Sequence, residues 1–224
     1  MDEIRYTLIT DGSSDRALIP ILTWVLHEKG EIDRIQPEWA DLHRLPRPPQ
    51  TLGDRISIAM KLYPCDLLFV HRDAEGKDPC HRYEEIRNAL REAAVQGIQP
   101  PAICVVPVRM TEAWLLINEP AIRIAAGNPN GTRPLSLPHL STIEEIRDPK
   151  ALLFDILRKA SGLKGRHLKA FNKAASRIRI TQLIDEFSPL RELGAFQRLE
   201  ENILELKQNG WSNAIGSQSA SSLD

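Results

Sequence analysis

The feature that most constrains the fold is an alternation of short apolar runs with helical patterns in the first half of the chain. Runs at residues 5–10, 66–72 and 103–108 have the length and composition of buried strands, and amphipathic segments at 16–29, 51–63, 81–96 and 111–118 follow in turn. A further strand at 35–42 contains Pro37, which favours an edge position. Strands and helices in this order predict an α/β fold with a parallel, right-handed sheet.

The second half of the chain has a different character. Residues 127–134 combine glycine, asparagine and proline, which predicts a long surface loop. Beyond Pro149 the patterns are helical only, at 150–161, 166–175, 178–187 and 193–208. We therefore expect an α/β core over residues 1–126, a loop insertion and helical extension packed on it over 127–208, and a disordered polar tail over 209–224.

Composition limits which cellular compartment and which partners are expected for this chain. Net charge is −1, so no global electrostatic attraction to nucleic acid or membrane is expected. Three cysteines with unpaired spacing suit a reducing compartment. The N-terminus has no signal-peptide pattern, and no apolar run approaches the ~20 residues that a membrane helix needs. These features predict a cytoplasmic protein without a membrane partner; whether it forms a homo-oligomer stays open.

Three acidic residues each follow one of the predicted strands. They are Asp11, Asp73 and Glu112. Because the carboxyl ends of parallel strands share one edge of a sheet, we expect these side chains to converge there. Carboxylates that converge repel one another unless a cation neutralises them, and hard divalent ions prefer oxygen ligands. The sequence therefore predicts a Mg²⁺ or Mn²⁺ site with catalytic roles for Asp11, Asp73 and Glu112.

Neighbouring residues extend this predicted site. Glu75 lies two positions after Asp73, so both side chains would project the same way from an extended chain and could share the metal. Gly12 and Asp15 belong to the turn after Asp11 and are expected to support it. Helix capping is the alternative explanation for Asp15, as first-turn stabilisation is for Glu112.

A basic segment is the other local signal. No acidic residue occurs between Ile156 and Ile184, and the segment contains many lysines and arginines. Such residues supply most sequence-independent affinity for nucleic acid, although a solvated helix face would have the same composition. The candidate phosphate contacts are Lys164, Arg166, Lys169, Lys173 and Arg177.

Together these motifs resemble the Toprim superfamily, and within it the group called domain of unknown function 4276. The resemblance rests on an acid-Gly-x-x-Asp turn at 11–15, the Asp-x-acid pair at 73–75, and Pro107 followed by Glu112-Ala-Trp-Leu-Leu. It implies a Rossmann-like Toprim core in which Asp11 occupies the place of a Glu acid/base, Asp73 and Glu75 form the metal pair, and Glu112 is a further acid. Relatives in antiphage defence systems lie beside ATPase genes, which implies an ATPase partner.

These expectations lead to a Mg²⁺-dependent, nuclease-like protein that acts on DNA or RNA. A catalytically degenerate Toprim subunit that binds a partner is the alternative, favoured by Asp11 standing where a Glu is usual. Hydrolysis of a small phosphorylated molecule is a third hypothesis. The chain has no P-loop pattern and no paired spacing typical of zinc sites.

Overall fold

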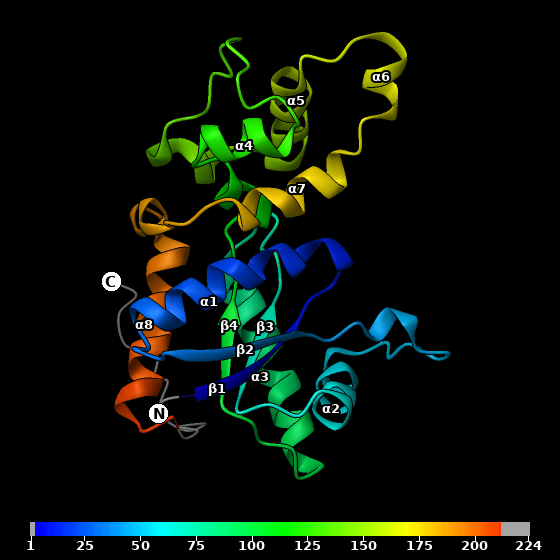
Figure 1. The fold of residues 1–224 in the computed structure, drawn as a ribbon. Coiled ribbons are helices and arrows are strands. Elements are labelled where there is room, and N and C mark those ends of the chain that lie inside the picture. The colour runs from blue at the N-terminus through cyan, green and yellow to red at the C-terminus, as the bar shows by residue number, and fades with distance from the viewer. Residues whose placement is uncertain (1–2, 212–224) are drawn as a thin grey trace.

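The computed structural model describes residues 3–211, and its centre is a sheet of four strands (Figure 1). The strands are β1 (Glu3–Ile9), β2 (Arg34–Trp39), β3 (Leu67–His71) and β4 (Ala102–Val105). They lie in the order β2-β1-β3-β4, and all neighbouring pairs are parallel. The predicted α/β fold with a parallel sheet is therefore confirmed, and β2, the strand that contains Pro37, lies at an edge.

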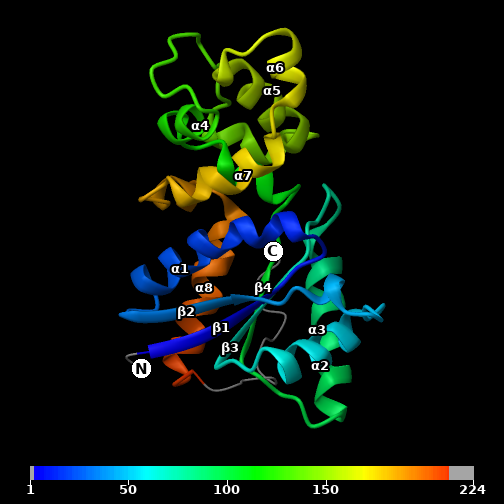
Figure 2. The same ribbon diagram turned by 45° about the vertical axis from the view of Figure 1, so that its right-hand side comes forward.

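Helices cover both faces of the sheet (Figure 2). One face packs against α1 (Leu18–Glu28) and α8 (Gly194–Gln208), and the other against α2 (Leu52–Leu62) and α3 (Pro79–Val95). Successive strand residues point to opposite faces. Along β3, Leu67 and Phe69 accordingly join the cluster on the α1 and α8 side, whereas Leu68 and Val70 join the cluster on the α2 and α3 side.

Two caps show how the sequence starts these helices. The Thr51 hydroxyl accepts a hydrogen bond from the Asp54 N–H at 3.1 Å and begins α2, as predicted. The Asp78 carboxylate accepts one from the Cys80 N–H at 2.8 Å, and Pro79 occupies the first position of α3. Both arrangements satisfy N–H groups that a helix start leaves without partners.

A second group of helices lies above the carboxyl edge of the sheet in Figure 1. It comprises α4 (Glu119–Ala125), α5 (Pro149–Ser161), α6 (Gly165–Ala170) and α7 (Lys173–Gln182). Short 3-10 helices lie between the longer elements: η1 (Ser13–Ala17), η2 (Leu42–Arg44), η3 (Thr111–Leu115), η4 (Leu140–Glu145) and η5 (Ser188–Glu192). One hydrophobic cluster contains Leu8 of β1, Leu153 of α5 and Ile180 of α7, so the helical extension shares a core with the sheet.

Several predicted helix boundaries are wrong. The segment predicted as one helix at 166–175 is two, because the chain is extended at Phe171 and the Asn172 side chain then caps α7 by accepting from the Ala175 N–H at 3.0 Å. The helix predicted at 178–187 is the second part of α7 and ends at Gln182. The segment at 111–118 forms only the 3-10 helix η3 before α4 begins.

The tail predicted to be disordered lies largely outside the described residues, since residues 212–224 are not among them. Residues 209–211 form a turn in which the Trp211 N–H donates to the Leu206 carbonyl at 2.8 Å. Within residues 3–211, no helix has the length and apolar character needed to cross a membrane.

Candidate active site

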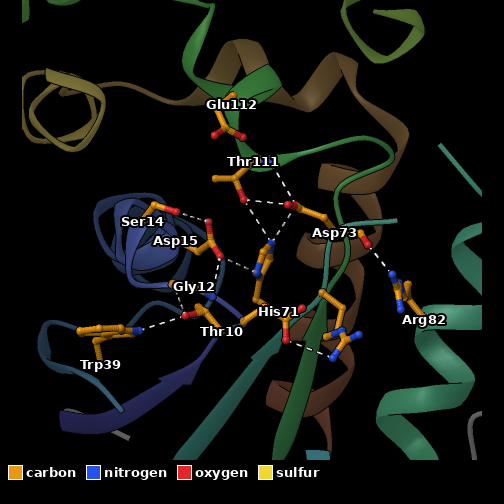
Figure 3. Close-up of polar contacts among 12 residues, drawn as sticks. Thr10, Gly12, Ser14, Asp15, Trp39, His71, Asp73, Arg82, Thr111 and Glu112 are labelled. Atoms are coloured by element: carbon orange, nitrogen blue, oxygen red, sulfur yellow. Dashed lines mark hydrogen bonds and ion pairs between the residues drawn. The ribbon is translucent and has the colours of Figure 1, made fainter. Parts of the chain in front are cut away.

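The predicted acidic residues lie where three adjacent strands end. Asp11 follows β1, Asp73 follows β3, and Thr111 and Glu112 begin η3 after β4. Because β1, β3 and β4 are neighbours in a parallel sheet, these segments share its carboxyl edge. Side chains at this edge form two groups. The inner cluster lies beneath α7, is drawn in part in Figure 3, and consists of Asp15, His71, Asp73, Thr111, Glu112 and Arg177. The outer network lies on the side of α2 and α3 and consists of Asp11, Arg55, Arg72, Glu75, Arg82 and Glu85.

Asp73 belongs to the inner cluster and is held by one of its two oxygens. Its Oδ1 lies 3.1 Å from His71 Nε2, accepts the Thr111 N–H at 3.1 Å, and is 3.5 Å from the Thr111 hydroxyl (Figure 3). Among the described residues Oδ2 has no hydrogen-bond partner, and the side chain is 25% exposed. The carboxylate is thus fixed from one side and free to bind a ligand with the other.

His71 connects Asp73 to the turn that contains Asp15. The ring is buried, its Nε2 is 3.1 Å from the Thr111 hydroxyl, and its Nδ1 lies 3.9 Å from Asp15 Oδ2 with no hydrogen-bond partner. With the proton assigned to Nε2, His71 donates toward Asp73 and leaves Nδ1 without a hydrogen. Asp15 also accepts the Gly12 N–H at 3.3 Å at the start of η1, which is the helix capping given above as the alternative explanation for Asp15.

Arg177 lies at the centre of the inner cluster and corrects one prediction. Its side chain is 2% exposed, with Nη1 on Glu112 Oε1 and Nη2 3.1 Å from Asp15 Oδ1. A guanidinium that two buried carboxylates occupy in this way does not contact nucleic-acid phosphates. Arg177 therefore belongs to the interior, and it brings α7 of the helical extension onto the carboxyl edge of the sheet.

Asp11 lies in the outer network rather than in the inner cluster. Its Oδ1 accepts from Arg55 Nη1 at 2.8 Å and from Arg72 Nη1 at 3.0 Å, and its side chain is 44% exposed. Arg72 also pairs with Glu85, at 3.1 Å through Nη2. Glu85 in turn raises the pKa of Arg82 by accepting a hydrogen bond from it. Acids and arginines thus alternate along this side of the edge.

Glu75 does not pair with Asp73 as predicted. The prediction assumed an extended chain, but Glu75 has a φ of 56° in the left-handed region, and Gly76 follows with a φ of 77°. This turn directs Glu75 to Arg82, whose Nη2 lies 3.4 Å from Glu75 Oε2. Arg82 also donates from Nε to the Asp73 carbonyl at 3.0 Å, so the loop after β3 is held to α3.

The remaining candidate phosphate contacts form a separate surface, which we call the basic arm. Three of them are exposed on or just before α6, and Lys173 is half-buried with its Nζ 5.1 Å from the centre of the Phe154 ring. The basic arm consists of Lys164, Arg166, Lys169 and Lys173. In Figure 1, α6 lies beyond α7 in the upper part of the molecule, away from the sheet.

The carboxylates that remain available suit a divalent ion only in part. No group of three or more His, Cys, Asp or Glu side chains within residues 3–211 is arranged to hold a metal by itself. Mg²⁺, however, usually binds through one or two carboxylates and completes its shell with water and substrate phosphate. Asp73, with its free oxygen, and Asp11, with an exposed carboxylate, are each available as a ligand of that kind.

The comparisons add no assignment: no family model, no curated protein and no solved structure matches this chain. The resemblance to Toprim proteins therefore stays a prediction. Sequence reasoning assigned no site role to four residues that the structure brings to the edge: His71, Thr111, Arg55 and Arg72. His71 and Arg72 directly precede Asp73 in the chain, and that proximity was the available signal.

Proposed function

We propose that this chain is a divalent-metal-dependent phosphodiester hydrolase that acts on DNA or RNA. The observation that carries the proposal is the arrangement of Asp73, whose Oδ1 takes hydrogen bonds from His71 and Thr111 while Oδ2 has no partner among the described residues. A carboxylate that is already held in position loses less free energy to reorganisation when it binds a ligand. Its position at the carboxyl edge of a parallel sheet, where such folds bind ligands, supports the same proposal.

In this proposal Asp73 holds the cation, with Asp11 as the second carboxylate. A bound Mg²⁺ or Mn²⁺ ion supplies charge neutralisation at the scissile phosphate and activates water. His71 and Thr111 fix the orientation of Asp73, and Asp11 would act as a metal ligand or as a proton-transfer group. Glu112 acts indirectly, through the ion pair that holds Arg177. The basic arm would bind the substrate backbone.

The test is cleavage of labelled single-stranded DNA, duplex DNA and RNA with Mg²⁺, Mn²⁺ or a chelator. Asp73→Asn should abolish cleavage and the thermal stabilisation that Mn²⁺ gives the wild type. That stabilisation approaches about 2.7 kcal/mol when the ion is at a hundredfold excess over its Kd. Asp66→Asn is the matched control because Asp66 directly precedes β3, at the opposite edge, and pairs with Arg5 there. Cleavage by Asp73→Asn at the wild-type rate, or cleavage in chelator, would contradict the proposal.

A binding subunit without hydrolytic activity is the second candidate. It is favoured by the arginines that already neutralise the acids: Arg177 pairs with Asp15 and Glu112, and two arginines pair with Asp11. Such a subunit would act through a partner, and the resemblance implies an ATPase. Wild-type protein that neither cleaves nor gains stability with Mn²⁺ would select this candidate.

A further inference from the structure

Two arginine side chains from different elements meet at a single carboxylate oxygen. Arg55 lies in α2 and Arg72 directly follows β3, and both place Nη1 within 3.0 Å of Asp11 Oδ1. One carboxylate balances only one of two guanidinium charges. The outer network as a whole is neutral because Glu75 and Glu85 supply the other negative charges against three arginines, with Arg82 as the third.

This neutrality depends on Asp11. Three arginines face three carboxylates in the outer network. If the negative charge of Asp11 is neutralised, three positive charges face two negative ones. The excess positive charge would be located at Arg55 and Arg72, where Asp11 is their shared partner. A divalent cation that bound Asp11 would create this excess at the place where a phosphate would enter.

Both arginines are prepared for an anion. Their side chains are 22% and 17% exposed, so each is mostly packed and still reaches solvent. Arg55 is anchored on α2, and Arg72 is the first residue after β3, where its N–H donates to the Val105 carbonyl at 3.1 Å; such anchoring lowers the entropy lost when a ligand binds. A guanidinium presents a planar set of donors that matches the oxygens of a phosphate.

Stability does not explain why these charges gather here. An exposed ion pair contributes about 0–1 kcal/mol, and Asp11 is among the more exposed residues of the network. At the opposite edge of the same strands, Arg5 and Asp66 form a one-to-one pair at 3.4 Å. The convergence of two arginines on one carboxylate oxygen at the carboxyl edge therefore contrasts with the single pair at the opposite edge.

We propose that Arg55 and Arg72 form a phosphate-binding subsite in which Asp11 is the resident counter-ion. A phosphate oxyanion replaces Asp11 on the two guanidinium groups when the charge of Asp11 is taken up by a cation. The role of the cation rests on the proposed function, but the anion subsite does not. The ligand class is the phosphate group that a phosphodiester and a phosphomonoester share.

The decisive variant is Asp11→Asn, which removes the counter-ion and leaves both arginines. With a chelator present and no metal, it should bind a fluorescent single-stranded oligodeoxynucleotide about tenfold more tightly than the wild type does, the scale of one charge-assisted hydrogen bond. Adding Arg55→Ala to Asp11→Asn should cancel the gain. Asp66→Asn removes the same charge at the opposite edge, where it frees Arg5, and should leave affinity unchanged.

Three results would overturn the subsite: no gain in Asp11→Asn with any phosphate probe, an equal gain in Asp66→Asn, or a gain that survives Arg55→Ala. A nucleoside 5′-monophosphate and inorganic phosphate serve as further probes. A gain with any of these probes supports the subsite, and a gain confined to the monoester identifies a small phosphorylated molecule as its occupant. Because these measurements use neither metal nor cleavage, a gain in Asp11→Asn combined with failure of the cleavage test would refute hydrolysis and leave the subsite standing.

Discussion

Replacing Arg177 with methionine should destabilise the protein strongly. Arg177 is buried and pairs with Asp15 and Glu112, which are themselves buried. Methionine fills a similar volume without charge, so the variant mainly leaves two carboxylates in the interior without their cation. Removing one partner of a buried ion pair costs about 3–5 kcal/mol because the remaining charge stays desolvated.

The cost should fall unequally on the two carboxylates. Asp15 keeps the Gly12 N–H and the Ser14 hydroxyl, each at 3.3 Å. Glu112 has no other hydrogen-bond donor among the described residues. Adding Glu112→Gln to Arg177→Met should therefore recover at least half of the lost free energy of unfolding. For a chain of this size, a loss of about 3–5 kcal/mol lowers Tm by about 6–20 °C.

Urea unfolding followed by tryptophan fluorescence measures this cost. Trp114 is a suitable reporter because it is buried two residues from Glu112 and packs against Phe196 with ring centres 5.5 Å apart. Arg5→Ala is the control, since it breaks an exposed pair and should cost less than about 1 kcal/mol. An Arg177→Met variant no less stable than Arg5→Ala, or a double variant no more stable than Arg177→Met, would refute the reasoning.

Three other predictions concern the basic arm, the orientation of Asp73 and the effect of pH. Changing all four residues of the basic arm to alanine should reduce the slope of log affinity against log salt by about three, and unchanged binding would mark a solvated face. His71→Ala should weaken Mn²⁺ binding, measured by electron paramagnetic resonance, about 10–100-fold, and His71→Gln should restore much of it by placing an N–H near Nε2; equal losses would count against a positioning role. The Arg5 backbone N–H lowers the pKa of Asp66, so its stabilisation is present above the unfolded pKa of about 4 and is lost in more acidic solution. Asp66→Asn should accordingly cost stability by urea unfolding at neutral pH and nothing at about pH 2; a constant cost would contradict this.

Local sequence determined the α/β core and the place of its acids. Alternating strand and helix patterns predict the parallel sheet, and Pro37 marks β2 as an edge strand because proline cannot donate to a ladder. The caps at Thr51 and Asp78 and the acids at strand ends are also readable, since they depend only on neighbours within a few residues. The carboxyl edge was therefore predictable as the candidate site.

Helix boundaries in the extension were less readable. The basic segment has helical periodicity throughout, and only Asn172, whose side chain caps α7, marks the break after α6. The short helix α4 was missed although Asn118 and Pro120 are typical of a helix start. Glu75 was misjudged because its left-handed φ depends on the turn it forms with Gly76.

The role of each charge was decided by tertiary structure alone. In sequence, Arg177 is one of many basic residues in an acid-free segment, and nothing local distinguishes it from Lys173. In the fold, it reaches Glu112 at a separation of 65 residues and Asp15 at 162. Asp11 likewise meets Arg55 and Arg72 only because α2 and β3 bring them to the end of β1. Ion pairs between distant residues have no period or spacing in the chain, so only the packing of α7 and α2 against the sheet selects which acids remain free for a ligand.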